Sequence, residues 1–166
     1  MTIDAADRAF LQRAIDLSRH ALLNEGKTPF GAVVVLDGEI TGEGTSQVVE
    51  LCDPTAHAEV MALRASSTAL GRHLTTGGIM YSSSEPCPMC LAACYWAQIS
   101  RVVYAATSHD VATYGFEDLQ LYRELTKPNE QRTIVEHAAG QDQREEAVRG
   151  LRDWTENLPF PVEPKY

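Results

Sequence analysis

The stretch GIMYSSSEPCPMCLAACYWAQISRVVYAA, residues 78–106, decides the fold. Its two ends, 78–82 and 101–106, are short apolar runs typical of buried strands. Between them, 88–98 has a helical pattern with a proline near its first turn, where proline is tolerated. A strand, a helix and a second strand within about 30 residues predict a βαβ unit.

Upstream of this unit the sequence changes between helical and strand patterns. Apolar residues recur at helical spacing over 5–23, and 30–36 is a continuous, largely β-branched run. Asp37-Gly38 suits a tight turn and leads into 39–43, so this part predicts a β-hairpin. Helical spacing returns over 55–70, after a loop without any period.

Downstream of the unit the pattern is looser. A short helical stretch ends at Leu125, residues 133–136 read as a final short strand, and 144–157 as a charged amphipathic helix. We expect an α/β fold, a three-layer α/β/α sandwich around a mixed five-stranded sheet. One domain should span 1–157, followed by a tail over 158–166 whose three prolines deny it regular structure of its own.

The charge balance argues against nucleic acid as a partner. Fourteen Lys and Arg against 23 Asp and Glu give the 166-residue chain a net charge of −9, and the basic residues are scattered singly. Binding to phosphates needs clustered cations. No segment approaches the roughly 18 apolar residues of a membrane span, and no basic region precedes an apolar run at the N-terminus. We therefore expect a soluble, cytoplasmic protein without a membrane partner.

One His and two Cys form the candidate metal site. Four cysteines are too few for a disulfide scaffold, so their spacing is read first as metal or catalytic chemistry. Cys87 and Cys90 lie one helical turn apart at the start of a predicted helix, and His57 lies near the start of another. Catalytic zinc takes three N or S ligands and keeps a fourth position open for water. We expect one Zn²⁺ per chain on these three residues.

Glu59 lies two residues after His57, which places its carboxylate beside the expected metal rather than on it. Zinc lowers the pKa of its water towards about 7, and a carboxylate within hydrogen-bond distance can move that proton to a departing amine. The H-x-E and P-C-x-x-C patterns together match the signature of zinc base deaminases. The sequence therefore predicts a hydrolytic deaminase with Glu59 as its general acid/base.

A structural zinc is the alternative for a C-x-x-C pair, and it would need a fourth ligand. Cys94 and Cys52 are the candidates. Cys94 lies about 5 Å further along the helix, too far to complete a tetrahedron comfortably, and is expected in the core. Cys52 precedes the metal His in a loop, where a ligand or redox role stays open.

At this point the sequence resembles the cytidine-deaminase-like superfamily, and within it the guanine deaminase branch. The resemblance covers most of the chain. It is carried by Pro29-Phe30-Gly31-Ala32-Val33-Val34, by Asp53-Pro54-Thr55-Ala56-His57-Ala58-Glu59-Val60, by Glu85 through Cys90 with Tyr95-Trp96-Ala97, by Gly115-Phe116-Glu117-Asp118 and by the terminal Tyr166.

The resemblance implies deamination of a free purine, guanine to xanthine with release of ammonia. It implies zinc on His57, Cys87 and Cys90, and Asp118 as a second catalytic residue that helps to bind the purine and relay protons. The substrate-binding residues that it implies are Phe30 and Trp96 as aromatic walls, Ser46, Ala58 and Tyr166. It also implies a homodimer in which a swapped C-terminal segment closes the partner's active site.

Ser46 departs from the family, which has an Asn at this place in the loop. A hydroxyl cannot donate and accept in the two-pronged way of an amide, so another amine stays an alternative substrate: guanosine, cytosine, a triazine or a pterin. A tRNA adenosine deaminase fits the zinc motif but not the charge of −9. A non-catalytic zinc module would close its site with four ligands and have no use for Glu59.

Simpler roles stay open for four of these residues. Phe30 and Trp96 could be ordinary aromatic residues of the core. Asp118 could be a helix N-cap, and Tyr166 could be a chain end without a function.

Overall fold

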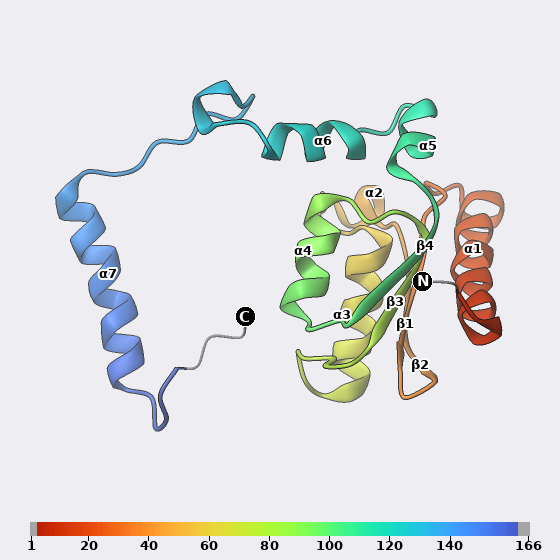
Figure 1. Ribbon diagram of the computed structural model, residues 1–166, viewed down its shortest axis with the longest axis horizontal. Coiled ribbons are helices and arrows are strands. Elements are labelled where there is room, and N and C mark those ends of the chain that lie inside the picture. The colour runs from red at the N-terminus through yellow and green to blue at the C-terminus, as the bar shows by residue number, and fades with distance from the viewer. Residues whose placement is uncertain (1–2, 163–166) are drawn as a thin grey trace. The chain divides into compact units, whose positions relative to one another are not determined.

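A four-stranded mixed sheet forms the centre of the fold in this computed structural model, which describes residues 3–162 (Figure 1). Its strands are β1 (Gly31–Leu36), β2 (Glu39–Thr45), β3 (Ile79–Ser84) and β4 (Arg101–Ala106), in the order β2-β1-β3-β4. β1 runs antiparallel to β2 and β3, and β3 runs parallel to β4. The predicted hairpin and the predicted βαβ unit are therefore both confirmed.

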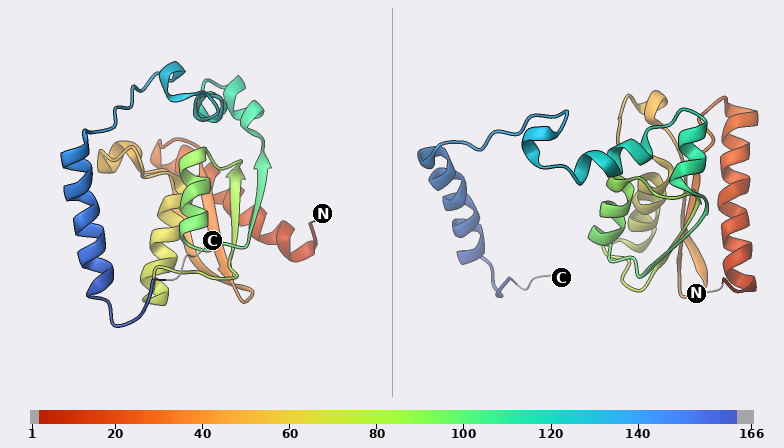
Figure 2. Two further views of the ribbon diagram at one scale, coloured as in Figure 1. Left: turned by 60° about the vertical axis from the view of Figure 1, so that its left-hand side comes forward. Right: turned by 45° about the horizontal axis from the view of Figure 1, so that its top comes forward.

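Helices cover both faces of this sheet. α1 (Ala5–Glu25) packs on one face, and α3 (Ala58–Leu70) and α4 (Pro88–Trp96) pack on the other, as all the views show (Figure 2). Because side chains alternate along a strand, β1 feeds both layers: Val33 joins the cluster under α1, and Val34 joins the cluster under α3. The three-layer α/β/α arrangement is as predicted.

The sheet has four strands and not five, which corrects the prediction. Residues 133–136 are irregular, and their apolar side chains Ile134 and Val135 are 77% and 69% exposed. A strand needs a hydrogen-bonded neighbour, and 133–136 pairs with no strand of the described chain. An apolar composition alone therefore does not make 133–136 a strand.

Contacts divide the chain into two compact units, the second of which begins at Lys127. The first also contains α2 (Val48–Leu51), α5 (Ser108–Thr113) and α6 (Asp118–Leu125). The second contains the short 3-10 helix η1 (Asn129–Gln131) and α7 (Gln141–Glu156). Among residues 3–162 no helix is long and apolar enough to span a membrane. The domain limits at 157 and 158 stay a prediction.

Two glycines let β2 lie directly on α3. A Cβ atom at Gly42 or Gly44 would collide with the backbone of α3, at Ala62 and Ala58 respectively. Glycine is required where two backbones approach this closely. The contact at Gly44 fixes the N-terminus of α3, where the candidate site begins.

A buried acidic residue ties α1 to the sheet. Asp7 accepts hydrogen bonds from the Tyr81 hydroxyl at 2.7 Å and from two nitrogens of Arg101 at 2.9 and 2.6 Å. The Arg101 guanidinium and the Tyr81 hydroxyl hold the pKa of Asp7 well below its usual range. The α1 layer is thus anchored to β3 and β4 by charge as well as by packing.

Candidate active site

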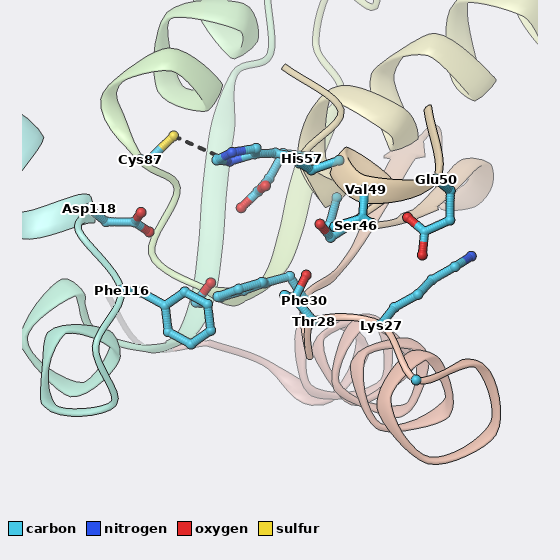
Figure 3. A pocket seen from close by; sticks show the side chains of 15 residues that line it. Lys27, Thr28, Phe30, Ser46, Val49, Glu50, His57, Cys87, Phe116 and Asp118 are labelled. Atoms are coloured by element: carbon cyan, nitrogen blue, oxygen red, sulfur yellow. Dashed lines mark hydrogen bonds between the residues drawn. The ribbon is translucent and has the colours of Figure 1, made fainter. Parts of the chain in front are cut away.

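Two helix N-termini bring the expected metal ligands together. His57 is the N-cap residue of α3, Cys87 is the N-cap residue of α4, and Cys90 lies in the first turn of α4. The Cys87 sulfur lies 3.6 Å from His57 Nδ1 and 3.6 Å from the Cys90 sulfur (Figure 3). The three ligand atoms all lie within 4.8 Å of one another. Pro88 occupies the first turn of α4, where its missing N–H costs no hydrogen bond.

The donor set fits zinc. One imidazole nitrogen and two thiol sulfurs are the ligands that zinc prefers, and three of them leave one tetrahedral position open. The neighbouring Cys90 thiol and the His57 ring lower the pKa of Cys87, which favours the thiolate form that binds metals. Both cysteines are buried, which protects the cluster from bulk water.

The fourth ligand of a structural zinc site is not found among residues 3–162. Cys94 is buried further along α4, and burial raises the pKa of its thiol to about 12. Cys52 is exposed. Neither belongs to the His57, Cys87 and Cys90 cluster. The cluster therefore has the three ligands of a catalytic site.

Glu59 lies beside this cluster in the first turn of α3 and is only 5% exposed. The Ser82 hydroxyl of β3 donates a 2.8 Å hydrogen bond to Glu59 Oε1, which orients the carboxyl group. Burial raises the pKa of Glu59 above its ordinary value. A buried carboxyl group held next to a metal cluster is placed to take up a proton and to return it.

A cavity of about 310 Å³ opens beside the cluster. Predicted site residues that line it are Phe30, Ser46, His57, Ala58, Glu59, Cys87 and Asp118. The ring of Phe116 meets the ring of Phe30 edge to face, with centroids 4.8 Å apart. In Figure 3 His57, Cys87 and Asp118 lie towards one end of the cavity, and Lys27 and Glu50 lie at the other. Aromatic walls with polar groups at both ends suit a flat heterocycle.

Asp118 is the first residue of α6 and not its N-cap, a position that Glu117 occupies without a side-chain cap. The alternative role as an N-cap is therefore wrong. Burial, followed by the charge of Cys87, raises the pKa of Asp118. Its half-buried carboxyl group faces the same cavity as the metal cluster, where it is available to a ligand.

The structure does not bring every predicted residue to this cavity. Trp96, at the end of α4, is 69% exposed and is not among the described residues that line it. Tyr166 lies outside the described residues. The second aromatic wall is Phe116, which sequence reasoning noted only as part of a motif. Ser84 also lines the cavity, but it lies two residues beyond the predicted strand 78–82, and no sequence pattern marked it.

Comparisons with known proteins agree with this geometry. Residues 4–106 match the family model for the cytidine and deoxycytidylate deaminase zinc-binding region. The chain is 48% identical to a guanine deaminase of Bacillus subtilis over 125 residues, which are 75% of this chain and 80% of the relative. It superimposes on the X-ray structure of guanine deaminase from the same organism with a TM-score of 0.84, at 38% identity over 99% of both chains.

A second group of relatives is similar over a shorter part of the chain. A tRNA-specific adenosine deaminase of Agrobacterium fabrum is 42% identical over 80 residues, which are 48% of this chain and 53% of the relative. Residues 4–106, which match the family model, include all three ligands of the cluster and Glu59.

Proposed function

The chain belongs to the family defined by the cytidine and deoxycytidylate deaminase zinc-binding region, and is a zinc-dependent aminohydrolase; from this premise we propose that it converts guanine to xanthine and ammonia. The observation that carries the proposal is the three-ligand cluster with the buried Glu59 beside it, at one end of a cavity with aromatic walls. The guanine deaminase of Bacillus subtilis is similar over most of the chain, which favours a free purine as the substrate.

The chain's own residues divide the work of hydrolysis. His57, Cys87 and Cys90 would hold the zinc ion, which supplies Lewis-acid activation of water at neutral pH. Phe30 and Phe116, whose rings meet edge to face, form one aromatic wall against the flat ring and exclude bulk water from the reacting carbon. Asp118 is placed to bind the substrate and relay protons.

Glu59 is the proton carrier in this mechanism. Its carboxylate takes a proton from the attacking water while the new C–O bond forms at the amine-bearing carbon. The carboxyl group then gives that proton to the amine, the C–N bond breaks and ammonia leaves. The hydrogen bond from Ser82 keeps Oε1 in place during both transfers. Burial raises the pKa of Glu59 above its ordinary value, which strengthens the carboxylate as the base for the first transfer.

Ser46 supports a second candidate, the deamination of a different aminated heterocycle. Its hydroxyl lines the cavity in the place where the family has an amide, and a change in one buried polar contact can alter substrate preference strongly. Guanosine, cytosine, a triazine and a pterin are the alternatives. A tRNA substrate is disfavoured because the net charge of −9 opposes binding to phosphates.

The test is to incubate the purified, zinc-loaded protein with guanine and with each alternative, and to measure ammonia release. Guanine should give the highest kcat/KM, and its other product should be xanthine. If guanine releases no ammonia while another amine does, the proposed substrate is wrong and the reaction class stands. If no amine reacts, the proposed function is wrong.

Assembly and location complete the proposal. We propose a homodimer whose tail over 158–166 covers the partner's active site, as the family resemblance implies. We also propose a cytoplasmic location, because all four cysteines are free thiols, which fits a reducing compartment.

A further inference from the structure

Two buried hydroxyl groups face the cavity from different elements of the fold. Ser46 follows β2 and is 7% exposed, and Ser84 is the last residue of β3 and is 5% exposed. Both residues line the cavity that contains the metal cluster. Neither hydroxyl has a hydrogen-bond partner among residues 3–162. Among the described residues, Thr75 is the only one whose side-chain oxygen is fully enclosed and has no hydrogen-bond partner. The two serine oxygens are therefore not fully enclosed, and the space they open to is the cavity.

A buried hydroxyl is stable only when it makes a hydrogen bond, here to water or to a ligand in the cavity. The remaining polar side chains that line the cavity do not compete for this role. His57, Glu59, Cys87 and Asp118 form the reacting end, and Lys27, Thr28 and Glu50 are less deeply buried. Lys27 is already paired with Glu25, at 2.5 Å. The two serines are thus the buried polar side chains left for the part of the ring that does not react.

We propose that Ser84 is a substrate-recognition residue that hydrogen-bonds the ring of the bound purine, in partnership with Ser46. This inference rests on the proposed function. Ser84 lies three residues before the metal ligand Cys87, at the carboxyl end of the parallel pair β3 and β4. In α/β folds, ligands bind at the carboxyl ends of the strands. The hydroxyl approaches the ring from β3, whereas Ser46 approaches it from the loop after β2.

The contact of Ser84 is made to a part of the substrate that does not change during the reaction. An interaction that is equally strong in the ground state and in the transition state affects KM and leaves kcat unchanged. A neutral hydrogen bond of ordinary strength corresponds to a change of about 3- to 10-fold in affinity. A recognition role for Ser84 therefore predicts a rise in KM of this size when its hydroxyl is removed.

The experiment compares Ser84→Ala with the wild-type protein and with Ser83→Ala as a matched control. Ser83 is the preceding residue on the same strand, and its hydroxyl accepts a hydrogen bond from the Gly31 backbone N–H at 3.1 Å. Steady-state kinetics with guanine should give a KM about 3- to 10-fold higher for Ser84→Ala, with kcat within about twofold. Ser83→Ala should keep the wild-type KM. Thermal denaturation and zinc content show that each variant is folded and loaded.

A second readout does not depend on turnover. Hypoxanthine is guanine without its amine, so it binds without reacting, and its Kd is measured by calorimetry. The Kd should rise in Ser84→Ala by the same factor as KM. In the double variant Ser46→Ala/Ser84→Ala the two factors should multiply, because two hydroxyls that bond different atoms of the ring act independently.

Each outcome has one meaning. An active wild-type protein together with an unchanged KM and Kd in Ser84→Ala overturns the inference and leaves the proposed function intact. A fall in kcat at constant KM would also overturn it, because Ser84 would then act on the chemistry. A wild-type protein that does not deaminate guanine overturns the proposed function, and the inference fails with it.

Discussion

Replacing Glu59 with Gln isolates the proton carrier from every other part of the site. Gln has the same shape as the protonated form of Glu, and its amide oxygen can still accept the hydrogen bond that Ser82 donates at 2.8 Å. Burial already favours the neutral form of Glu59 by raising its pKa, so a neutral amide should be accommodated without a loss of packing. The variant should therefore fold and bind zinc like the wild-type protein.

Turnover of Glu59→Gln should fall by about 10²- to 10⁴-fold, which is the usual contribution of a positioned general acid/base and corresponds to about 2.7–5.4 kcal/mol in the activation barrier. The other acidic residues of the cavity cannot substitute for Glu59. Glu50 is exposed, and Asp118 is only half-buried on a different helix. The described part of the cavity thus offers no second carboxyl group in the same place.

The assay is ammonia release from guanine at saturating substrate, with zinc content measured by mass spectrometry on the same samples. Glu39→Gln is the matched control, since it makes the same chemical change at an exposed position outside the cavity and should keep wild-type turnover. Near-normal turnover of Glu59→Gln at full zinc occupancy would show that Glu59 is merely structural. That result would refute the mechanism.

Three further predictions concern the metal, the fold and the tail. Cys87→Ala and Cys90→Ala should each lose the zinc and part of the thermal stability, whereas Cys94→Ala should keep one zinc per chain. Metal analysis of the purified variants tests this, and full zinc occupancy in Cys87→Ala or Cys90→Ala would show that the replaced cysteine is not a ligand. Asp7→Asn should lower Tm at neutral pH. The partners of Asp7 lower its pKa in the folded protein, so the ionised carboxylate contributes its full share of the free energy of unfolding above the ordinary pKa of 3.8. That contribution is lost as the pH falls below 3.8. Denaturation at several pH values should therefore show the stabilities of the two proteins converging in acid, and a constant difference between them would contradict this. Truncation after Asn157 should leave a folded, zinc-loaded core with a steeply reduced kcat/KM; an unchanged kcat/KM would mean that the tail is idle.

Local sequence patterns predicted the centre of the fold because each was decided by neighbouring residues. Asp37 and Gly38 both adopt positive φ, at 52° and 81°, as the tight turn of the hairpin requires. The metal ligands were predictable for a similar reason. The ligands lie at the starts of two helices, so predicting each helix correctly was enough to identify them. The fold then brings His57 Nδ1 within 3.6 Å of the Cys87 sulfur.

Features that depend on distant contacts were not predictable in this way. Residues 133–136 have the composition of a strand, but whether they pair depends on a sheet edge that the local sequence does not describe. Phe116 becomes a wall of the cavity because its ring meets Phe30, which lies 86 residues away in the chain. Ser84 faces the cavity because its strand ends beside the metal cluster. α2 and α5 were missed because each is too short to show a period.

The most direct test of the account is a zinc titration of the deaminase activity. Zinc is removed from the purified protein with a chelator and returned in measured steps, and ammonia and xanthine are measured after incubation with guanine at each step. Both products should form in equal amounts, and their rate should rise in proportion to bound zinc until about one ion is held per chain. Activity that is independent of zinc, or no ammonia from guanine at full occupancy, would contradict it.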